Sequence, residues 1–526
     1  MNKIIFFLAV LLTGFTACKK SDFEGSYTNP SRIATTNVEK QFTGMLVTNR
    51  EYVIPSYWNY FVVLRTSVNH YIQAVGWENG ANQYIPGAAS ITDRWNNYYN
   101  FLSQYRELEK VYNTLTPENQ ELNRIYMIAA TVYFYDHTQK VVDLHGDIPW
   151  SQAGKLSTNG GDYANSYPAY DKAEDIYTKM LDDLKAFASE LNTIDVPSGI
   201  QAGFKTQDVI NKGNMDLWKK YVNSLRLRML TRVSGSADFS ARAESEIAEI
   251  VGNPSQFPLV SNNDENIMIR IFDLNSPLNS QGFQSGLEDW NGNIAGKAMI
   301  DHMNTNDDPR LPALFEPGTN AGGVYNGLDP LLPGSNQAAQ IAGGTMAIYN
   351  RSTISRNDFF PGMLINAAEV NFYLAEYYLK AGNDAAAKTA YETGVRQSTE
   401  FYYWVRTVSN DNTAAALDPL DPADVDAYLS SPAVSWDAAA TAEAKLKLIS
   451  TEKWIHYNVI QPLESWAEIR RLDNLDFEFE TDNSSGQQQP PARWIYPGSE
   501  LTYNAENYAA VSGSDNLNTK LFWDVQ

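Results

Sequence analysis

Apolar side chains recur every three or four residues over four stretches in the first half of the chain, at about 95–115, 117–142, 170–191 and 217–233. This spacing places apolar groups on one face of an α-helix and leaves the opposite face polar. The first stretch shows it most fully, through Trp95, Tyr98, Tyr99, Leu102, Tyr105, Leu108 and Val111. The pattern predicts a helical block over about 95–250.

A second helical block is predicted over about 362–475. Between 371 and 394, large and small residues alternate as in a tetratricopeptide pair, where small residues let two antiparallel helices approach: Leu374, Ala375, Tyr378, Ala387, Tyr391 and Gly394. Gly382 and Asn383 between them fit a helix end followed by a turn. We therefore expect a mainly α-helical fold built on tetratricopeptide-like helical pairs.

Two stretches, 254–360 and 405–435, lack this periodicity and are rich in Gly, Asn, Pro, Asp and Ser. Long loops in a compact protein are either functional or disordered, and a rigid scaffold is what positions functional loops. With a helical block on either side, 254–360 is interpreted as a loop-rich insert that contributes a ligand-binding face. Residues 476–526 form a separate C-terminal segment.

The chain of 526 residues carries 62 acidic and 40 basic side chains, for a net charge of −22. This balance argues against nucleic-acid binding, which requires clustered Lys and Arg, and against adhesion to an anionic membrane through a basic face. Hydrophobic residues make up 43% of the chain, enough for a core, and aromatic residues an unusual 12%.

The N-terminus has the organisation of a secretory signal: a Lys near the start, an apolar run from Ile4 to Leu12, and small residues before Cys18. We expect residues 1–17 to be a signal peptide and Cys18, the chain's single cysteine, to be acylated as a membrane anchor. Residues 18–30 would then be a lipidated tether. The alternative is an ordinary signal peptide whose cysteine is incidental.

Metal and catalytic motifs are weak. The five histidines lie far apart and lack the spacing of a zinc protease, and Asp418, Asp421, Asp424 and Asp426 lack the rhythm of an EF-hand. We expect no metal site and no cofactor. The presence of a structural calcium ion stays an open possibility, although no sequence motif supports it.

Loop aromatics beside amide side chains are the candidate ligand-binding residues. A sugar-binding surface needs flat rings that face solvent and polar groups that take the hydroxyls. Three loop segments offer both, through Trp77, Asn79 and Tyr84, then Phe283, Trp290 and Asn291, then Tyr325. Local packing is the competing interpretation for each ring. Trp77 and Trp290 are the strongest candidates, because their Gly and Asn neighbours cannot easily bury them.

Seven features in order along the chain resemble the SusD/RagB family of outer-membrane nutrient-binding lipoproteins. One is Cys18 in its lipoprotein context, and the others are 144–150 (LHGDIPW), 218–232 (WKKYVNSLRLRMLTR), 308–311 (DPRL), 368–376 (AEVNFYLAE), 464–471 (ESWAEIRR) and 493–497 (RWIYP). Each segment is short, but their order across nearly the whole chain is specific. The resemblance implies a single SusD-like domain over 31–526.

The resemblance also implies a role. Members of this family are non-catalytic lipoproteins on the outer face of the outer membrane, where they cap a SusC-like TonB-dependent barrel and capture oligosaccharides or peptides. Two other functions stay open from the residues alone. One is a membrane-anchored glycoside hydrolase, which needs two facing carboxylates. The other is a helical-repeat adaptor that binds proteins in its concave groove.

Overall fold

A computed structural model describes residues 36–526, and they form a mainly helical protein, which confirms the expected fold class. The predicted signal peptide, Cys18 and the tether up to residue 30 lie outside the described residues. Within the described part, no helix combines the length and the apolar character needed to cross a membrane.

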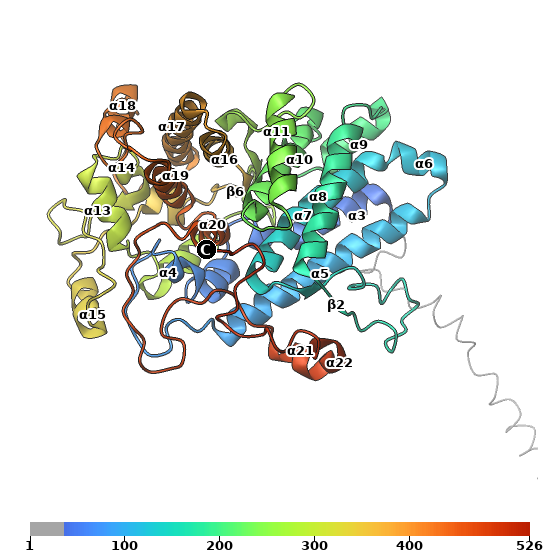
Figure 1. Ribbon diagram of the computed structural model, residues 1–526, viewed down its shortest axis with the longest axis horizontal. Coiled ribbons are helices and arrows are strands. Elements are labelled where there is room, and N and C mark those ends of the chain that lie inside the picture. The colour runs from blue at the N-terminus through green and yellow to red at the C-terminus, as the bar shows by residue number, and fades with distance from the viewer. Residues whose placement is uncertain (1–35) are drawn as a thin grey trace, which may run out of the picture.

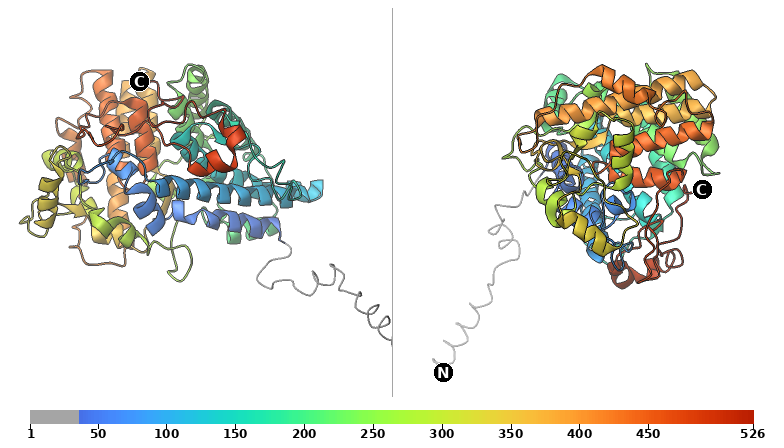
Figure 2. Two further views of the ribbon diagram at one scale, coloured as in Figure 1. Left: turned by 90° about the horizontal axis from the view of Figure 1, so that it is seen from below. Right: turned by 90° about the vertical axis from the view of Figure 1, so that its left-hand side faces the viewer.

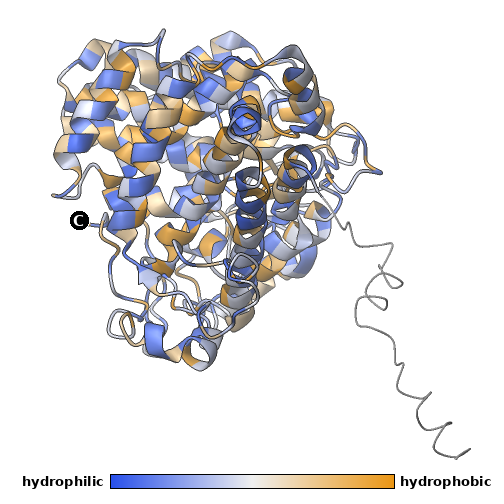
Figure 3. Cartoon of the chain, turned by 90° about the vertical axis from the view of Figure 1, so that its right-hand side faces the viewer, coloured by the Kyte–Doolittle hydropathy of each residue, from blue (hydrophilic) through white to orange (hydrophobic). Residues whose placement is uncertain are grey.

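The first helical block matches the four periodic stretches, and the helix predicted from residue 95 begins earlier, at Ala88. Its helices are α3 (Val38–Thr48), α5 (Ala88–Asn113), α6 (Pro117–Leu122), α7 (Arg124–His145), α8 (Ala173–Glu190), α9 (Ser198–Gln207), α10 (Met215–Val233) and α11 (Ser240–Gly252). Hydrophilic and hydrophobic residues lie side by side along the same helices (Figure 3), as amphipathic packing requires.

The second block contains α16 (Ala367–Lys380), α17 (Asp384–Val408), α18 (Pro422–Ser430), α19 (Ala442–Tyr457) and α20 (Pro462–Leu472). The helical pair predicted around Gly382 and Asn383 is confirmed as α16 and α17. Asn383 caps α17 by accepting a hydrogen bond from the Ala386 amide. Gly394 permits the close approach of the pair, because a Cβ there would lie 2.6 Å from the Phe372 ring. The two blocks lie side by side (Figure 1).

The segment between the blocks is less irregular than its composition indicated, because short helices and strands interrupt the loops. These elements are η3 (Asn263–Glu265), β3 (Ile267–Ile269), α12 (Phe283–Glu288), η4 (Asp289–Asn291), α13 (Lys297–Thr305), α14 (Leu311–Leu314), β4 (Phe315–Glu316), α15 (Gly334–Ala342), β5 (Ile348–Tyr349), η5 (Arg351–Ser355) and β6 (Gly362–Ile365). The strands pair in antiparallel fashion, β3 with β6 and β4 with β5. Helices α13 to α15 gather at the end of the molecule far from α6 (Figures 1 and 2).

The remaining elements line the lower side of the molecule in Figure 1 or connect the helices. They are η1 (Arg50–Tyr52), the π-helix η2 (Trp58–Leu64), α4 (Val68–Tyr71), the antiparallel pair β1 (Ile148–Pro149) and β2 (Tyr170–Asp171), α21 (Gly498–Tyr503) and α22 (Ala505–Tyr508). The C-terminal segment reaches back to the first block, where the Trp494 amide donates to the Leu144 carbonyl.

Buried ion pairs join the two blocks. Arg226, Arg228 and Arg232 on α10 have fully buried side chains, and all three form ion pairs. Arg228 reaches Asp136 on α7 and Glu369 on α16. Arg232 pairs with Asp143, Glu464 and Glu468. Arg226 pairs with Glu246 on α11, within the first block. Because the guanidinium groups of Arg228 and Arg232 each contact helices from both blocks, these two residues fix the relative position of the blocks.

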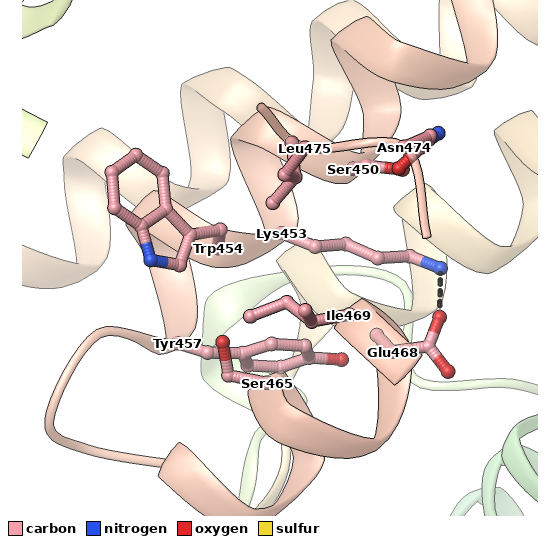
Figure 4. A pocket seen from close by; sticks show the side chains of 9 residues that line it. All are labelled: Ser450, Lys453, Trp454, Tyr457, Ser465, Glu468, Ile469, Asn474 and Leu475. Atoms are coloured by element: carbon pink, nitrogen blue, oxygen red, sulfur yellow. Dashed lines mark hydrogen bonds and ion pairs between the residues drawn. The ribbon is translucent and has the colours of Figure 1, made fainter. Parts of the chain in front are cut away.

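A small cavity between α19 and α20 is also part of this packing. Lys453 points across it to Glu468, with 2.8 Å between Nζ and the carboxylate oxygen (Figure 4). The cavity encloses about 10 Å³, room for one water molecule. It is too small for a ligand.

Candidate functional site

Trp77 is held in place by a close contact at the residue before it. The Gly76 amide donates to the Ile294 carbonyl at 2.7 Å, and a Cβ on Gly76 would lie 2.6 Å from the Leu328 side chain. Val75 and Ala295 form an antiparallel bridge, and Gly296 and Leu328 a parallel one. These contacts bring three segments far apart in sequence together and place Trp77 beside the loop that carries Trp290.

Trp290 projects from that loop with 81% of its surface exposed. Trp290 and Asn291 both adopt left-handed backbone conformations, with φ of 58°. Such conformations are unfavourable for residues with a Cβ and tend to occur at functional sites. The loop is anchored at the end of α12, where Glu288 accepts two hydrogen bonds from Arg356 and one from Ser355.

Arg65 lies against both tryptophans. Its guanidinium carbon is 5.9 Å from the ring centre of Trp77 and 5.9 Å from that of Trp290. Gly292 packs on its aliphatic stem, since a Cβ there would lie 3.3 Å from Arg65 Cδ. Among the described residues, no carboxylate lies within 4.0 Å of Arg65 and its Nε has no hydrogen-bond partner. Partial burial lowers the pKa of Arg65 below its ordinary value.

Further rings extend this surface along η2. Arg65 lies 4.4 Å from the ring centre of Phe61, and Phe61 stacks on Tyr57 at 5.0 Å. Tyr57 makes an edge contact with Trp58, which is 52% exposed. We call this set the Arg65 platform: Tyr57, Trp58, Phe61, Arg65, Trp77 and Trp290. Its first four members were not predicted from the sequence, although the four-residue spacing of Tyr57, Phe61 and Arg65 is a signal that could have indicated them.

Tyr84 does not face solvent, and the expectation of an exposed ring there is wrong. It is fully buried, and its hydroxyl donates to the Glu480 carbonyl at 2.6 Å. The Tyr84 ring stacks on His70 at 5.3 Å, and His70 stacks on Trp77 at 5.0 Å. Burial lowers the pKa of His70 to about 3, so this ring is neutral near pH 7. Tyr84 therefore supports Trp77 from behind.

Phe283 also differs from expectation. It is fully buried in the core, 4.5 Å from the ring centre of Tyr60 and 5.5 Å from that of Phe360. Phe283 lies on the face of α12 that is buried together with Gly286 and Leu287, so its ring points into the core and not toward solvent.

Asn79 and Tyr325 have mainly structural contacts. The Asn79 amide donates to the carbonyls of Pro330 and Leu332 at 2.7 and 2.9 Å and so holds the loop before α15. Tyr325 is half-buried, and its carbonyl accepts a hydrogen bond from Asn304. No aromatic contact within residues 36–526 joins Tyr325 to either tryptophan. Asn291, by contrast, is exposed next to Trp290.

The platform combines apolar ring faces with one cation, and the exposed Asn291 next to Trp290 adds an amide. A pyranose ring has an apolar C–H face that can stack on Trp, and hydroxyls that can accept from a guanidinium or bond to an amide. The carboxylate of a peptide or acidic sugar could also reach Arg65. Within the described residues, no group of three or more His, Cys, Asp or Glu side chains could hold a metal ion.

Residues 35–497 match the model of the SusD-like family described as starch-binding and associating with the outer membrane. Because the match spans most of the chain, this chain belongs to that family. No curated protein sequence matches it.

Solved structures share the fold. A Bacteroidetes SusD-like protein, AC2a, has a TM-score of 0.74 and 20% identity, and the alignment covers 93% of this chain and 100% of that one. A chitin-binding SusD homologue from Flavobacterium johnsoniae has a TM-score of 0.70 and 22% identity, with 92% and 99% covered. A SusD homologue from Bacteroides fragilis has a TM-score of 0.69 and 21% identity, with 93% and 99% covered. The helical pairs and the loop-rich side are thus features of a known architecture.

Proposed function

We propose that this chain binds oligosaccharides on the Arg65 platform at the cell surface and delivers them to a SusC-like TonB-dependent barrel. The observation that carries the proposal is the exposed Trp290 beside Trp77 and an Arg65 without a carboxylate partner among the described residues. The family description, starch-binding, and the chitin-binding neighbour make glycans the preferred ligand class. Peptides are the second class, since Arg65 could bind their carboxylates.

Binding is tested by calorimetry with maltohexaose, chitohexaose and an acidic hexapeptide. Trp77→Ala and Trp290→Ala should each weaken saccharide binding by about 30-fold, equivalent to about 2 kcal/mol for an aromatic anchor. Tyr503→Ala is the control, because Tyr503 is 75% exposed and lies outside the platform. If the two tryptophan variants bind as the control does, the site is elsewhere.

The chain is proposed to bind without catalysis. A glycosidase needs two carboxylates on either side of the scissile bond. The carboxylate at the end of α12, Glu288, is engaged by Arg356 and Ser355, which supports a structural role. Incubating the protein with the same hexasaccharides should release no new reducing ends, and turnover would contradict the proposal.

The anchor and the partner are proposed from the sequence and the family. Acylation of Cys18 would hold the domain on the exterior of the outer membrane, close to the transporter. Cys18→Ala should release the protein from the membrane fraction, and mass spectrometry of the mature N-terminus should find acyl chains on Cys18. Affinity purification from the native membrane should recover a TonB-dependent barrel. An unmodified thiol or a purified protein without a barrel would contradict these parts of the proposal.

A further inference from the structure

The guanidinium of Arg65 carries a charge that nothing in the described part of the chain balances. No carboxylate there lies within 4.0 Å of it, and none of its side-chain nitrogens has a hydrogen-bond acceptor. Nε is closed off from solvent, but the two Nη atoms keep accessible surface. Burial lowers the pKa of Arg65, and among the described residues the Tyr57 hydroxyl alone opposes this shift. The Nη atoms are therefore open to an anionic group that a ligand supplies.

The neighbours of Arg65 hold its guanidinium in one place. It lies 4.4 Å from the ring centre of Phe61 and 5.9 Å from the ring centres of Trp77 and Trp290. Gly292 packs on its aliphatic stem. A side chain that is already ordered loses little conformational freedom on binding, so the contact with a ligand can be both strong and directional.

Two exposed acids adjoin the tryptophans in sequence but do not balance Arg65. They are Glu78 and Asp289. Neither lies within 4.0 Å of the guanidinium, and neither contributes to the shift of its pKa. Glu288, the acid before Asp289, is bound by Arg356 at 2.8 Å. Salt screens exposed charges over distances of about 10 Å, so the charge that a ligand meets in direct contact is that of Arg65.

We propose that the Arg65 platform is selective for acidic glycans, oligosaccharides that contain hexuronic acid units. This inference rests on the proposed saccharide function and names the class of sugar. The common D-hexuronic acids have an equatorial carboxylate at the edge of the ring. Their C–H face therefore stays free to stack on Trp290 while the carboxylate accepts from the two Nη atoms of Arg65. Hydrogen bonds between a guanidinium and a carboxylate are about twice as strong as those between neutral groups, and the two planar groups match in shape.

The test is calorimetry of the whole protein with tetramers of galacturonic, glucuronic and mannuronic acid, each compared with its fully methyl-esterified form. Esterification keeps the sugar ring and removes the charge. At least one acid should bind at least tenfold more tightly than its ester, equivalent to about 1.4 kcal/mol. A ratio near one for all three tetramers would overturn the inference. So would tighter binding of neocarratetraose sulfate, which carries sulfate and no carboxylate, or of the acidic hexapeptide.

Variants of Arg65 separate its charge from its packing. Arg65→Gln should bring the ratio of acid to ester affinity close to one and leave the affinity for the ester within about threefold. Arg65→Lys keeps the charge without the planar fork and should retain part of the preference. Arg270→Gln is the matched control, because Arg270 is exposed, lies 5.5 Å from the ring centre of Trp404 and is outside the platform. A preference for the acid that survives Arg65→Gln would overturn the inference.

The outcomes also distinguish this inference from the saccharide function on which it rests. If neutral hexasaccharides bind and depend on Trp290, while the acids gain nothing over their esters, the saccharide function stands and the selectivity for acidic glycans is wrong. If Trp290→Ala changes the affinity for no saccharide, acidic or neutral, the saccharide function of the platform is wrong and the inference falls with it.

Discussion

Replacing Trp290 by Gly separates binding from stability at the Arg65 platform. The ring is 81% exposed, so its removal takes little apolar burial from the folded state. Its backbone has a φ of 58°, a conformation that costs a residue with a Cβ about 1–2 kcal/mol and costs Gly nothing. The same substitution removes a flat ring from the surface that is proposed to hold the saccharide.

The stability terms for Trp290→Gly nearly cancel. Relief of the left-handed conformation gains about 1–2 kcal/mol. The greater freedom of Gly in the unfolded chain costs about 0.5–1 kcal/mol, and loss of the exposed contact with Arg65 costs about 0.5 kcal/mol. The free energy of unfolding should therefore stay within about 0.5 kcal/mol of the original. Trp290→Ala keeps the unfavourable φ and should be about 1 kcal/mol less stable than Trp290→Gly.

Binding should respond differently. Loss of an aromatic anchor costs about 2 kcal/mol, which weakens the affinity for a hexasaccharide about 30-fold in both variants. Calorimetry gives the affinity, and thermal unfolding in the same buffer gives the stability. Unchanged affinity in Trp290→Gly would refute the role of the ring. A stability of Trp290→Gly below that of Trp290→Ala would refute the argument from backbone conformation.

Three further changes test the fold. Gly394→Ala places a Cβ 2.6 Å from the Phe372 ring. It should lower the free energy of unfolding by about 1 kcal/mol, because overpacking outweighs the better helix propensity of Ala. An increase in melting temperature would contradict this prediction. Arg228→Met leaves the buried Glu369 carboxylate without a basic partner, while Asp136 keeps Lys140, and it should cost about 3–5 kcal/mol in denaturant unfolding. A neutral result would show that the network does not join the blocks. All five histidines have pKa values lowered by burial, to about 3 for His70 and His456, so only the unfolded chain takes up their protons just below pH 6.5. Stability should be complete above about pH 6.5 and fall as the pH is lowered, by about 1.4 kcal/mol per pH unit for each of His70 and His456 down to about pH 3. The other three histidines should act in the same direction. His70→Phe should make this slope shallower, and an unchanged slope would contradict the assignment.

Local patterns predicted the helices well because helix formation depends on neighbouring residues. The pair α16 and α17 needed only apolar periodicity, small residues at the crossing and the Gly382–Asn383 turn. Trp77 and Trp290 were predicted to be exposed because their Gly and Asn neighbours offer no cover. The structure agrees for Trp290, whereas Trp77 is half-buried against His70.

Tyr84 and Phe283 show where local patterns fail. Tyr84 is covered by a segment almost 400 residues away, whose Glu480 carbonyl accepts its hydroxyl hydrogen bond. Phe283 faces Tyr60 and Phe360, and neither contact is visible from its own loop-like surroundings. Arg65 was missed for the same reason: its lack of a carboxylate partner among the described residues is a property of the folded chain. Whether Tyr84 and Phe283 are buried, and whether Arg65 has an ion-pair partner, depends on residues far away in the sequence.

The most direct test of the account is a crystal structure of the protein with the hexasaccharide that binds most tightly. We expect a sugar ring stacked on Trp290 or Trp77, with a polar group of the ligand within hydrogen-bond distance of the Arg65 guanidinium. A saccharide bound away from all three residues would contradict it.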